Sequence, residues 1–391
     1  MKTTIFLSLA LALCAFSARA EDSTESGPKF TVKPTGRILM DAATYMGGNS
    51  DYEEFGDQKF VSGVAIPDAR LGAKASYGNW SAKIDVGFGY GKVSLKDIFL
   101  QYNFNESNLI RGGYFCPQFG LNSETSSSMK PSYEEPRSNE FFYSNPRLLA
   151  IMYEYNKGQF LSATSLLCEA DAMKKNANEM GKQAWGVETR FVWRPRHDFG
   201  DAFQVGLSLN YMKPTADDHT ACSYSSNFPS RVSSVPLLSA TVTDAKGSFK
   251  LTPELLFVKN RFALEAQYYF MNVARKNGLD SYQAHGAYGL ARIMLLGKGY
   301  PYTASEGGVG TPAPKSLEMV LGYDYVDASD SKAGVMGGIS NDASCTFIYY
   351  INSWMLARLR YSYTDVRDRM VESLTPRRHV NTIEARLQII F

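Results

Sequence analysis

Apolar and polar residues alternate with a period of two over most of the chain, from about residue 35 to the end. Successive side chains of a β-strand point to opposite faces, so this pattern predicts strands with one apolar and one polar face. In one segment the apolar face is Trp185, Val187, Thr189, Phe191 and Trp193, and the polar face is Gly186, Glu188, Arg190 and Arg194. Residues 203–211, 262–270 and 355–363 repeat the pattern.

These segments have about the 9–11 residues that a tilted strand needs to cross a bilayer, whereas strands of soluble proteins usually have about 5–6. The spacing predicts an all-β protein, a transmembrane antiparallel β-barrel of about 16 strands. The expected strands lie near 35–46, 64–77, 79–90, 93–104, 107–115, 148–156, 159–168, 183–194, 202–213, 247–258, 261–275, 282–295, 316–328, 342–352, 354–366 and 379–391.

The connections alternate between tight turns and long polar loops, which is typical of outer-membrane barrels with short periplasmic turns and long extracellular loops. The expected loops are 47–61, 116–146, 169–182, 213–246, 327–342 and 366–378. Residues 232–242 are also strand-like, and we expect them to form a hairpin in an external loop or to extend the tenth strand. The connection 297–315 is long for a periplasmic turn.

The first residues read as a secretory signal peptide, residues 1–20. Lys2 is followed by an apolar stretch and by Ala18-Arg19-Ala20, which has the form of a signal-peptidase site. The alternative is a lipoprotein anchored at Cys14, although Leu13 stands where a small residue is preferred. A short periplasmic segment, 21–34, would then precede the barrel, 35–391.

Composition agrees with a barrel, because the hydropathies of an apolar outer face and a polar inner face cancel in the average over the chain. The mean hydropathy is −0.25, 13% of residues are aromatic and the net charge is +2, so no nucleic-acid partner is expected. Cys116, Cys168, Cys222 and Cys345 match no zinc pattern. A bridge between Cys168 and Cys222 and free thiols are both compatible with an oxidising compartment. We expect no metal and no cofactor.

The final segment, 379–391, has an apolar face of Ile383, Ala385, Leu387, Ile389 and Phe391 opposite a polar face of Thr382, Glu384, Arg386 and Gln388. An amphipathic last strand that ends on an aromatic residue resembles the signal that the barrel-insertion machinery reads. We therefore expect outer-membrane lipid around the barrel and the chain end at its periplasmic edge.

The polar faces are rich in charge, which stays hydrated inside a lumen but is costly on a lipid face. Sixteen strands usually leave an aqueous channel, and a basic excess favours anions. The other interpretation is that these charges pair across strands and set the register. The loop 116–146 is long enough to fold inward as a constriction. The candidate pore-lining and anion-contact residues are Arg37, Arg70, Lys74, Lys83, Arg111, Lys130, Arg137, Arg358 and Arg360.

Several segments, in order, resemble the phosphate-selective porin O/P family. They are Ala69-Arg-Leu-Gly72, Gly78-Asn-Trp80, Val93-Ser-Leu-Lys-Asp97, Gly112 to Leu121, Pro253-Glu254, Glu265 with Tyr268, Leu295-Leu-Gly-Lys298, 317–325 and Arg386 to Phe391. The resemblance covers nearly the whole mature chain. It implies a sixteen-stranded homotrimeric porin with the loop after strand five folded inward, and it accounts for the long connection 297–315.

The resemblance also implies phosphate binding by several arginines and lysines. This chain departs from the family pattern at Pro67-Asp68, where the family often has Arg-Arg. Oxyanion capture needs converging Arg or Lys donors, and this change removes two cations and adds a carboxylate.

The leading prediction is an outer-membrane porin of a Gram-negative bacterium for passive diffusion of small hydrophilic solutes, with an anion or phosphate preference as its narrower form. The alternative is a surface-exposed structural or adhesin-like barrel with a plugged lumen. An enzyme is not expected, because the four histidines lack a serine partner motif and no Gly-x-Ser-x-Gly occurs.

Overall fold

The computed structural model describes residues 27–46, 60–125, 129–143, 147–169, 183–214, 221–369 and 377–391. The predicted signal peptide, 1–20, and the alternative anchor Cys14 lie outside these residues, as do most of the loops 47–61 and 169–182 and part of the loop 366–378. Those assignments stay predictions.

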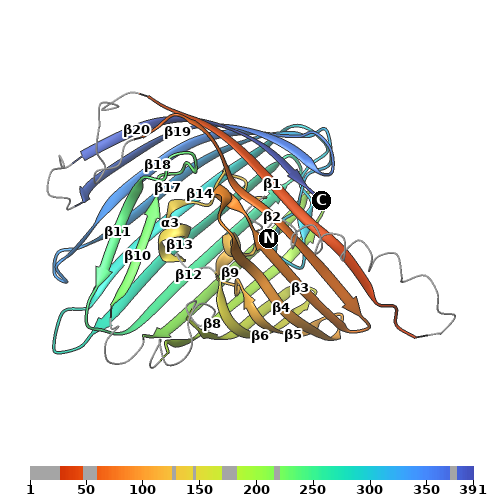
Figure 1. The fold of residues 1–391 in the computed structure, drawn as a ribbon, viewed down its shortest axis with the longest axis horizontal. Coiled ribbons are helices and arrows are strands. Elements are labelled where there is room, and N and C mark those ends of the chain that lie inside the picture. The colour runs from red at the N-terminus through yellow and green to blue at the C-terminus, as the bar shows by residue number, and fades with distance from the viewer. Residues whose placement is uncertain are drawn as a thin grey trace, which may run out of the picture.

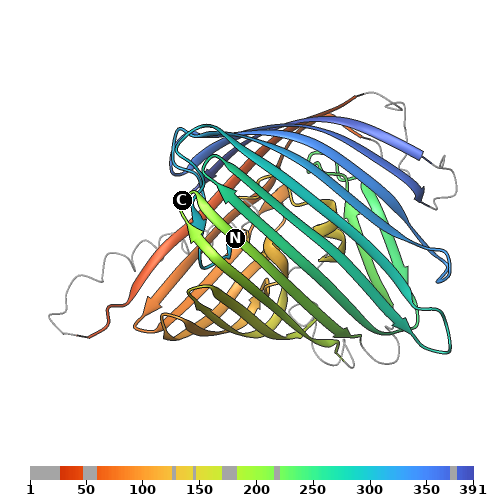
Figure 2. The ribbon, with the colours of Figure 1, turned by 180° about the vertical axis from the view of Figure 1, so that it is seen from behind.

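Sixteen antiparallel strands form a closed barrel, which confirms the predicted strand count and fold class (Figures 1 and 2). Two separate two-stranded hairpins, β10–β11 and β15–β16, complete the β structure of the described residues. The barrel strands are β1 (Thr31–Met46), β2 (Gly63–Tyr77), β3 (Trp80–Gly87), β4 (Ser94–Asn105), β5 (Asn108–Phe115), β6 (Leu148–Lys157), β7 (Phe160–Cys168), β8 (Trp185–Asp198), β9 (Asp201–Lys213), β12 (Ala245–Lys259), β13 (Phe262–Arg275), β14 (Tyr282–Leu296), β17 (Leu317–Asp330), β18 (Val335–Tyr350), β19 (Met355–Arg369) and β20 (Arg377–Ile390).

The first and last strands close the barrel. Residue Arg37 of β1 lies opposite Ile390 of β20, and the register continues to the pair Met46 and Asn381. Beyond β20, the backbones of Gly36 and Phe391 exchange two hydrogen bonds of 2.8 and 2.9 Å. The start of β1 and the end of β20 therefore lie at one end of the barrel, called here the turn end; the opposite end is called the loop end.

The two faces of the strands separate as the alternation predicts. On β8, Trp185 and Phe191 are about half exposed on the outside, whereas Arg190 between them is completely buried on the inside. On β20, Ile383 and Leu387 face outward and Arg386 faces inward. An apolar outer surface on every side is what a barrel in lipid requires.

The inner face differs from the expectation of a lumen that is hydrated all round. Inward residues on β13, β14 and β17 include large apolar side chains such as Tyr269, Met271 and Val326, which are buried inside the barrel. Inward charges such as Arg190 and Glu318 have no exposed surface. That expectation is wrong for this part of the wall, because segments of the chain fold inward and cover it.

Three connections supply these inward segments. The inner loop, residues 116–147, contains α2 (Gly120–Glu124) and α3 (Arg137–Phe142). The inner hairpin consists of β10 (Cys222–Asn227) and β11 (Pro236–Val242). The turn-end insert, residues 297–316, contains β15 (Tyr302–Thr303) and β16 (Gly308–Val309). Residues 232–242 thus belong to a hairpin of their own rather than to β12.

Other connections are shorter than predicted. The loop expected at 327–342 is a tight turn, because β17 extends to Asp330 and β18 begins at Val335. Gly334 provides the positive φ of 70° in this turn. A 3₁₀ turn, η1 (Gly89–Gly91), joins β3 to β4.

Among the described residues, no helix is long and apolar enough to cross a membrane.

Candidate pore lining and constriction

The inner loop crosses the inside of the barrel. Near its start, the backbone N–H of Gly120 donates to Ser208 of β9, and that of Asn122 donates to Gln267 of β13, each at 2.9 Å. Near its end, the N–H of Ser138 donates to the Asp324 carboxylate of β17 at 3.1 Å. Side chains of three strands therefore hold the loop by its backbone.

The middle of the inner loop reaches the closing strands. Tyr133 donates its hydroxyl hydrogen to the Ala385 carbonyl oxygen of β20 at 3.0 Å, and the guanidinium of Arg386 lies 4.4 Å from the centre of the Tyr133 ring. Arg386 also pairs with Asp41 of β1 at 2.7 Å. The same arginine therefore ties the loop to the seam between β20 and β1.

Glu134 is the acidic residue at this contact. Its carboxylate pairs with Arg386 and, at 2.8 Å, with Arg231, which precedes β11. Burial acts to raise the pKa of Glu134, but the two guanidinium groups outweigh burial and lower the pKa to about 2. Glu134 is therefore ionised at neutral pH and joins the inner loop, the inner hairpin and the barrel wall.

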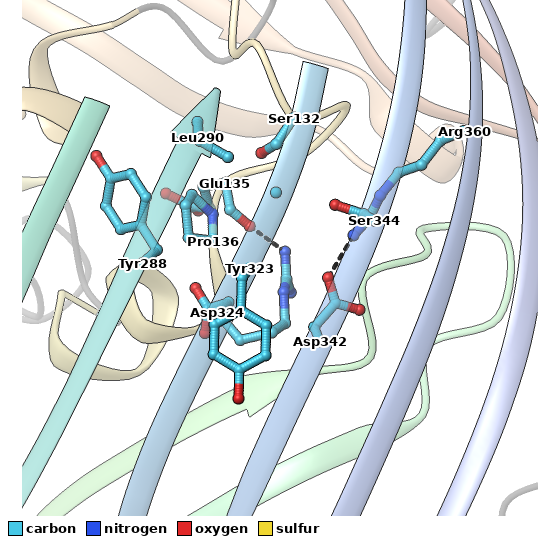
Figure 3. Close-up of a pocket in the computed structure, with 12 residues that line it drawn as sticks. Ser132, Glu135, Pro136, Tyr288, Leu290, Tyr323, Asp324, Asp342, Ser344 and Arg360 are labelled. Carbon is cyan, nitrogen blue, oxygen red and sulfur yellow. Dashed lines mark hydrogen bonds and ion pairs between the residues drawn. The ribbon is translucent and has the colours of Figure 1, made fainter. Parts of the chain in front are cut away.

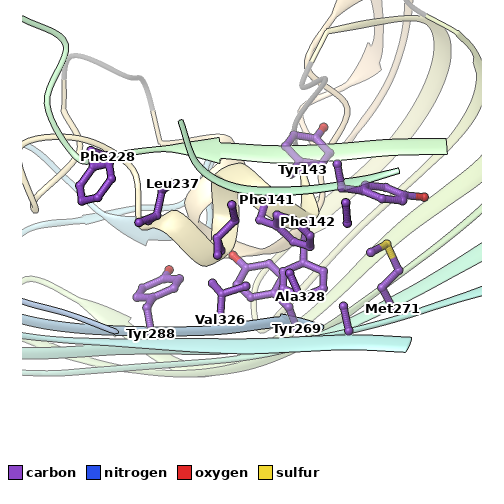
Figure 4. Close-up of a cluster of buried hydrophobic side chains, with 14 of the residues drawn as sticks. Phe141, Phe142, Tyr143, Phe228, Leu237, Tyr269, Met271, Tyr288, Val326 and Ala328 are labelled. Atoms are coloured by element: carbon purple, nitrogen blue, oxygen red, sulfur yellow. The ribbon is translucent and has the colours of Figure 1, made fainter. Parts of the chain in front are cut away.

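The inner hairpin packs on α3 and on the wall formed by β13, β14, β17 and β18. Figure 4 shows Phe141 and Phe142 of α3 between the hairpin and the strands, with Tyr269, Val326 and Ala328 below them. The ring of Phe142 stacks on that of Tyr269 with centroids 5.4 Å apart. This apolar cluster fills that side of the lumen.

The turn-end insert closes the lumen beside β8 and β9 from the opposite end. Arg190 donates to the carbonyl oxygens of Glu306 at 2.9 Å and Gly307 at 3.2 Å. Gln204 donates to the same Gly307 oxygen at 2.8 Å. Arg190 also forms a completely buried ion pair with Glu254 at 2.7 Å.

A small cavity remains behind the inner loop, between α3 and strands β14, β17, β18 and β19. Its volume of about 20 Å³ has room for about one water molecule. Figure 3 shows Asp324 and Asp342 beside it, with Arg360 bonded to Asp342. The cavity is too small to be a solute path.

The accessible part of the lumen lies along β1 to β5. Many inward side chains here are partly or fully exposed, among them Lys33, Lys74 and Arg111, although Arg37, Leu39, Asp41, Asp68 and Asp85 are buried. Inward side chains of β6 to β20 are mostly buried. We call this surface the basic wall. Its inward cations are Lys33, Arg70, Lys74, Lys83, Lys96 and Arg111, with Asp85 and Asp97 among them.

Three lysines form a row across the basic wall. Lys33 of β1 lies opposite Lys74 of β2, and Lys74 lies opposite Lys83 of β3. Lys83 in turn lies opposite Phe99 of β4. Like charges directly opposite each other destabilise a sheet, so this row costs stability and raises the positive potential at one level of the channel.

Asp68 partly neutralises the positive charge of the basic wall. Its carboxylate accepts from Arg37 at 2.5 Å and from Arg70 at 2.8 Å. Asp97 similarly pairs with Lys83 at 2.6 Å and with Arg147 at 2.8 Å. The departure from the family pattern at Pro67-Asp68 therefore leaves two arginines paired.

The predicted candidates fall into two groups. Arg37, Arg70, Lys74, Lys83 and Arg111 come together on the wall formed by β1 to β5.

The other four are buried by the inward segments. Lys130 bonds Asn122 within the inner loop, and Arg137 pairs with Glu140 at 2.5 Å. Arg358 donates to the Tyr133 carbonyl at 3.2 Å, and Arg360 pairs with Asp342 at 2.7 Å. As anion contacts, all nine residues stay predictions.

The candidates omitted further cations that lie near the accessible wall. Lys33 lies before the predicted start of the first strand. Arg147 lies between the predicted loop 116–146 and the strand that follows it, and Arg231 lies in the predicted loop 213–246. Lys96 faces inward beside Gly87, whose Cβ would lie 2.5 Å from the Lys96 Cε atom. In the register shift between β3 and β4 the extra residue lies on β4, at Lys96 and Asp97, and breaks the strict alternation there. Period-two reasoning would therefore place Lys96 outside.

No bridge joins Cys168 and Cys222, which carry free thiols. The described residues hold no group of three or more potential metal ligands.

A closed sixteen-stranded barrel with an apolar outer face and a long loop folded inside defines the porin type of outer-membrane protein. The chain belongs to the phosphate-selective porin O and P family, whose model matches residues 32–391. It is therefore an outer-membrane porin of Gram-negative origin. None of the curated proteins matches the chain.

Solved porins share the fold. An anion-selective porin from Comamonas acidovorans superposes with a TM-score of 0.59 at 10% identity, covering 93% of this chain and 100% of that one. The trimer form of OmpT of Vibrio cholerae has a TM-score of 0.56 at 12% identity, covering 93% and 99%. The outer membrane channel DcaP of Acinetobacter baumannii has a TM-score of 0.53 at 12% identity, covering 95% and 100%. Family and fold point to a channel rather than an enzyme.

Proposed function

We propose that this porin prefers anions and conducts them along the basic wall, past the constriction made by the inner loop. The observation that carries the proposal is the row of Lys33, Lys74 and Lys83 across three neighbouring strands. Lys33 and Lys74 are exposed in the lumen. A channel wall of one sign in a low-dielectric barrel concentrates ions of the opposite sign.

The paired arginines favour a general anion preference over a tight phosphate site. Phosphate recognition needs several converging donors on one oxyanion. In this chain Arg37 and Arg70 share the Asp68 carboxylate, and Lys83 is bound to Asp85 and Asp97. Each of these cations is thus already paired with a carboxylate, while Lys33 and Lys74 supply the exposed positive charge.

The reversal potential of the reconstituted full-length protein in a KCl gradient tests this proposal. We expect the sign of the reversal potential to show that chloride is more permeable than potassium. A potential of the opposite sign would overturn the anion preference. Liposome swelling with small sugars tests passive diffusion separately, because a plugged barrel of the structural or adhesin-like type gives no swelling.

The strands are short on one side of the barrel, and this supports assembly as a homotrimer. Strands β3 and β5 have 8 residues each, fewer than the roughly 9–11 that a strand needs to span the bilayer, whereas β18 has 16. Strands this short are tolerated where another copy of the chain, and not lipid, lies against the barrel. Cross-linking of cysteines introduced on the outer face of β4, at Leu100, is expected to join two copies.

Two further assignments belong to the same proposal. Residues 1–20 serve as the signal peptide for export. The apolar outer face of β20, continued by Phe391, supports recognition by the barrel-insertion machinery.

A further inference from the structure

The basic wall contains an apolar patch. Phe99 of β4 and Leu109 of β5 point inward and are only partly buried, with the fully buried Phe115 behind them. The rings of Phe99 and Phe115 meet edge to face with centroids 5.9 Å apart, which fixes the Phe99 ring. Apolar side chains that face water give up no hydrogen bonds when an apolar solute covers them. An exposed apolar patch in a charged aqueous channel therefore marks a contact site for apolar solutes.

A glycine lets β5 approach β4 closely at Phe99. Gly113 of β5 lies opposite Phe99, and a Cβ atom there would lie 2.9 Å from the Phe99 Cβ and 2.3 Å from the Ile98 carbonyl oxygen. Its φ of 145° also disfavours a side chain.

Arg111 is held at the edge of this patch. Its guanidinium lies 4.6 Å from the centre of the Phe99 ring and 5.4 Å from that of Phe115. The Nε of Arg111 donates to Gln101 at 3.0 Å, and Gln101 donates onward to Asn103 at 2.9 Å. The neutral Gln101 orients the guanidinium without cancelling its charge.

The neighbouring charges leave Arg111 available. Glu154 of β6 lies near enough to interact with Arg111 through its charge, but its carboxylate accepts hydrogen bonds from Gln118 at 2.9 Å and Asn156 at 3.3 Å. On the other side of the patch Phe99 lies opposite Lys83, which is paired with Asp85 and Asp97, and the exposed Lys74 lies next in the row. The patch is therefore apolar, with cations on both sides.

Building on the anion preference, we propose that the basic wall binds aromatic carboxylates: the carboxylate pairs with the Nη groups of Arg111, and the ring packs on Phe99 and Leu109. A planar carboxylate matches the fork of a guanidinium. An aromatic ring gains contact with Phe99 and Leu109, which inorganic phosphate and chloride do not. The channel would thus select organic anions by their apolar part.

Single-channel currents of the full-length protein in planar bilayers test this proposal. Sodium benzoate and sodium acetate are added to the same KCl solution, and the concentration that halves the chloride current is measured for each. One aromatic contact predicts a half-blocking concentration about threefold to tenfold lower for benzoate. Equal concentrations for the two anions would overturn the inference.

Two variants locate the effect. In Phe99→Ala the difference between benzoate and acetate should disappear, and in the milder Phe99→Leu it should shrink. In the matched control Phe104→Ala, on the same strand but on the outer face, the difference should persist. A benzoate preference that survives in both Phe99 variants contradicts the site. The reversal potential without organic anions reports the general anion preference, so the two proposals can fail separately.

Discussion

Lys74 of β2 and Lys83 of β3 lie directly opposite each other on the inner face of the barrel. Lys83 pairs with Asp85 at 2.8 Å and with Asp97 at 2.6 Å, whereas Lys74 is exposed in the lumen. The two lysines thus have different roles at one level of the channel. Lys83 is held in the wall by carboxylates, and Lys74 presents its charge to passing ions.

Reversing the charge at Lys74 is expected to reduce the anion preference. Lys74→Glu replaces a repulsive pair with an attractive one and removes the exposed cation, so the ratio of chloride to potassium permeability should fall about twofold or more. Reversal potentials at low salt measure it. Lys157→Glu, at the same end of the barrel but on the outer face, is the control, and an equal change there would assign the effect to surface charge.

Neutralising Asp68 is expected to act in the opposite direction. Asp68→Asn removes the carboxylate that Arg37 and Arg70 share and so raises the net positive charge of the channel. The chloride to potassium ratio should rise, and phosphate should block the current at lower concentration because two guanidinium groups become available. An unchanged ratio would mean that these arginines lie away from the ion path. Asp201→Asn, at the start of β9, is the comparison.

The ion pairs of Glu134 with Arg386 and Arg231 should persist at mildly acidic pH. The pKa of Glu134 is lowered to about 2 in the folded protein, from about 4.5 in the unfolded chain. The carboxylate therefore stabilises the fold fully above about pH 4.5, and this stabilisation is lost only as the pH falls towards about 2. We expect the current noise of the wild type to be the same at pH 7 and pH 4.

The variant Glu134→Gln should lose this contact at every pH. A hydrogen bond between charged groups contributes about 1.5–3 kcal/mol, and its loss should free the inner loop and raise the current noise already at pH 7. Noise that appears in the wild type between pH 5 and pH 4 would contradict the role of Glu134.

The buried pair of Arg190 and Glu254 should dominate the stability of the turn-end insert. Both side chains are completely buried, and removing one partner of a buried pair typically costs about 3–5 kcal/mol. Glu254→Gln should therefore shift the urea midpoint of unfolding in lipid vesicles to lower concentration. Lys259→Gln removes a half-exposed partner of Asp201 and should change the midpoint little, since exposed ion pairs contribute about 0–1 kcal/mol.

Much of the fold could be predicted from local pattern. The alternation in β8 and β20 assigns Trp185 and Ile383 to the lipid side and Arg190 and Arg386 to the inside, and the structure agrees. Side-chain direction follows from the two-residue period of a strand, so no knowledge of distant residues is needed. The strand count follows from the same period and from the length that a bilayer requires.

The candidate site was only partly predictable. Arg70, Lys74 and Arg111 could be assigned to the inner face one strand at a time. Lys96 could not, because the extra residue of a register shift lies on β4 at this point and interrupts the period. Arg231 could not either, because its segment has no periodic pattern.

Local sequence patterns are enough to specify a sixteen-stranded barrel with lipid outside and charge inside, since each strand carries its own two faces. Which part of that inner face meets water depends on how the whole chain folds. The inner loop, the inner hairpin and the turn-end insert bury the inward side chains of β6 to β20 through contacts between residues far apart in the chain, such as Tyr133 with Ala385 and Arg190 with Gly307. Such contacts depend on where a closed barrel places its connections, which no local pattern records. They leave β1 to β5 as the accessible wall and thereby select which of the many inward cations can act on a solute.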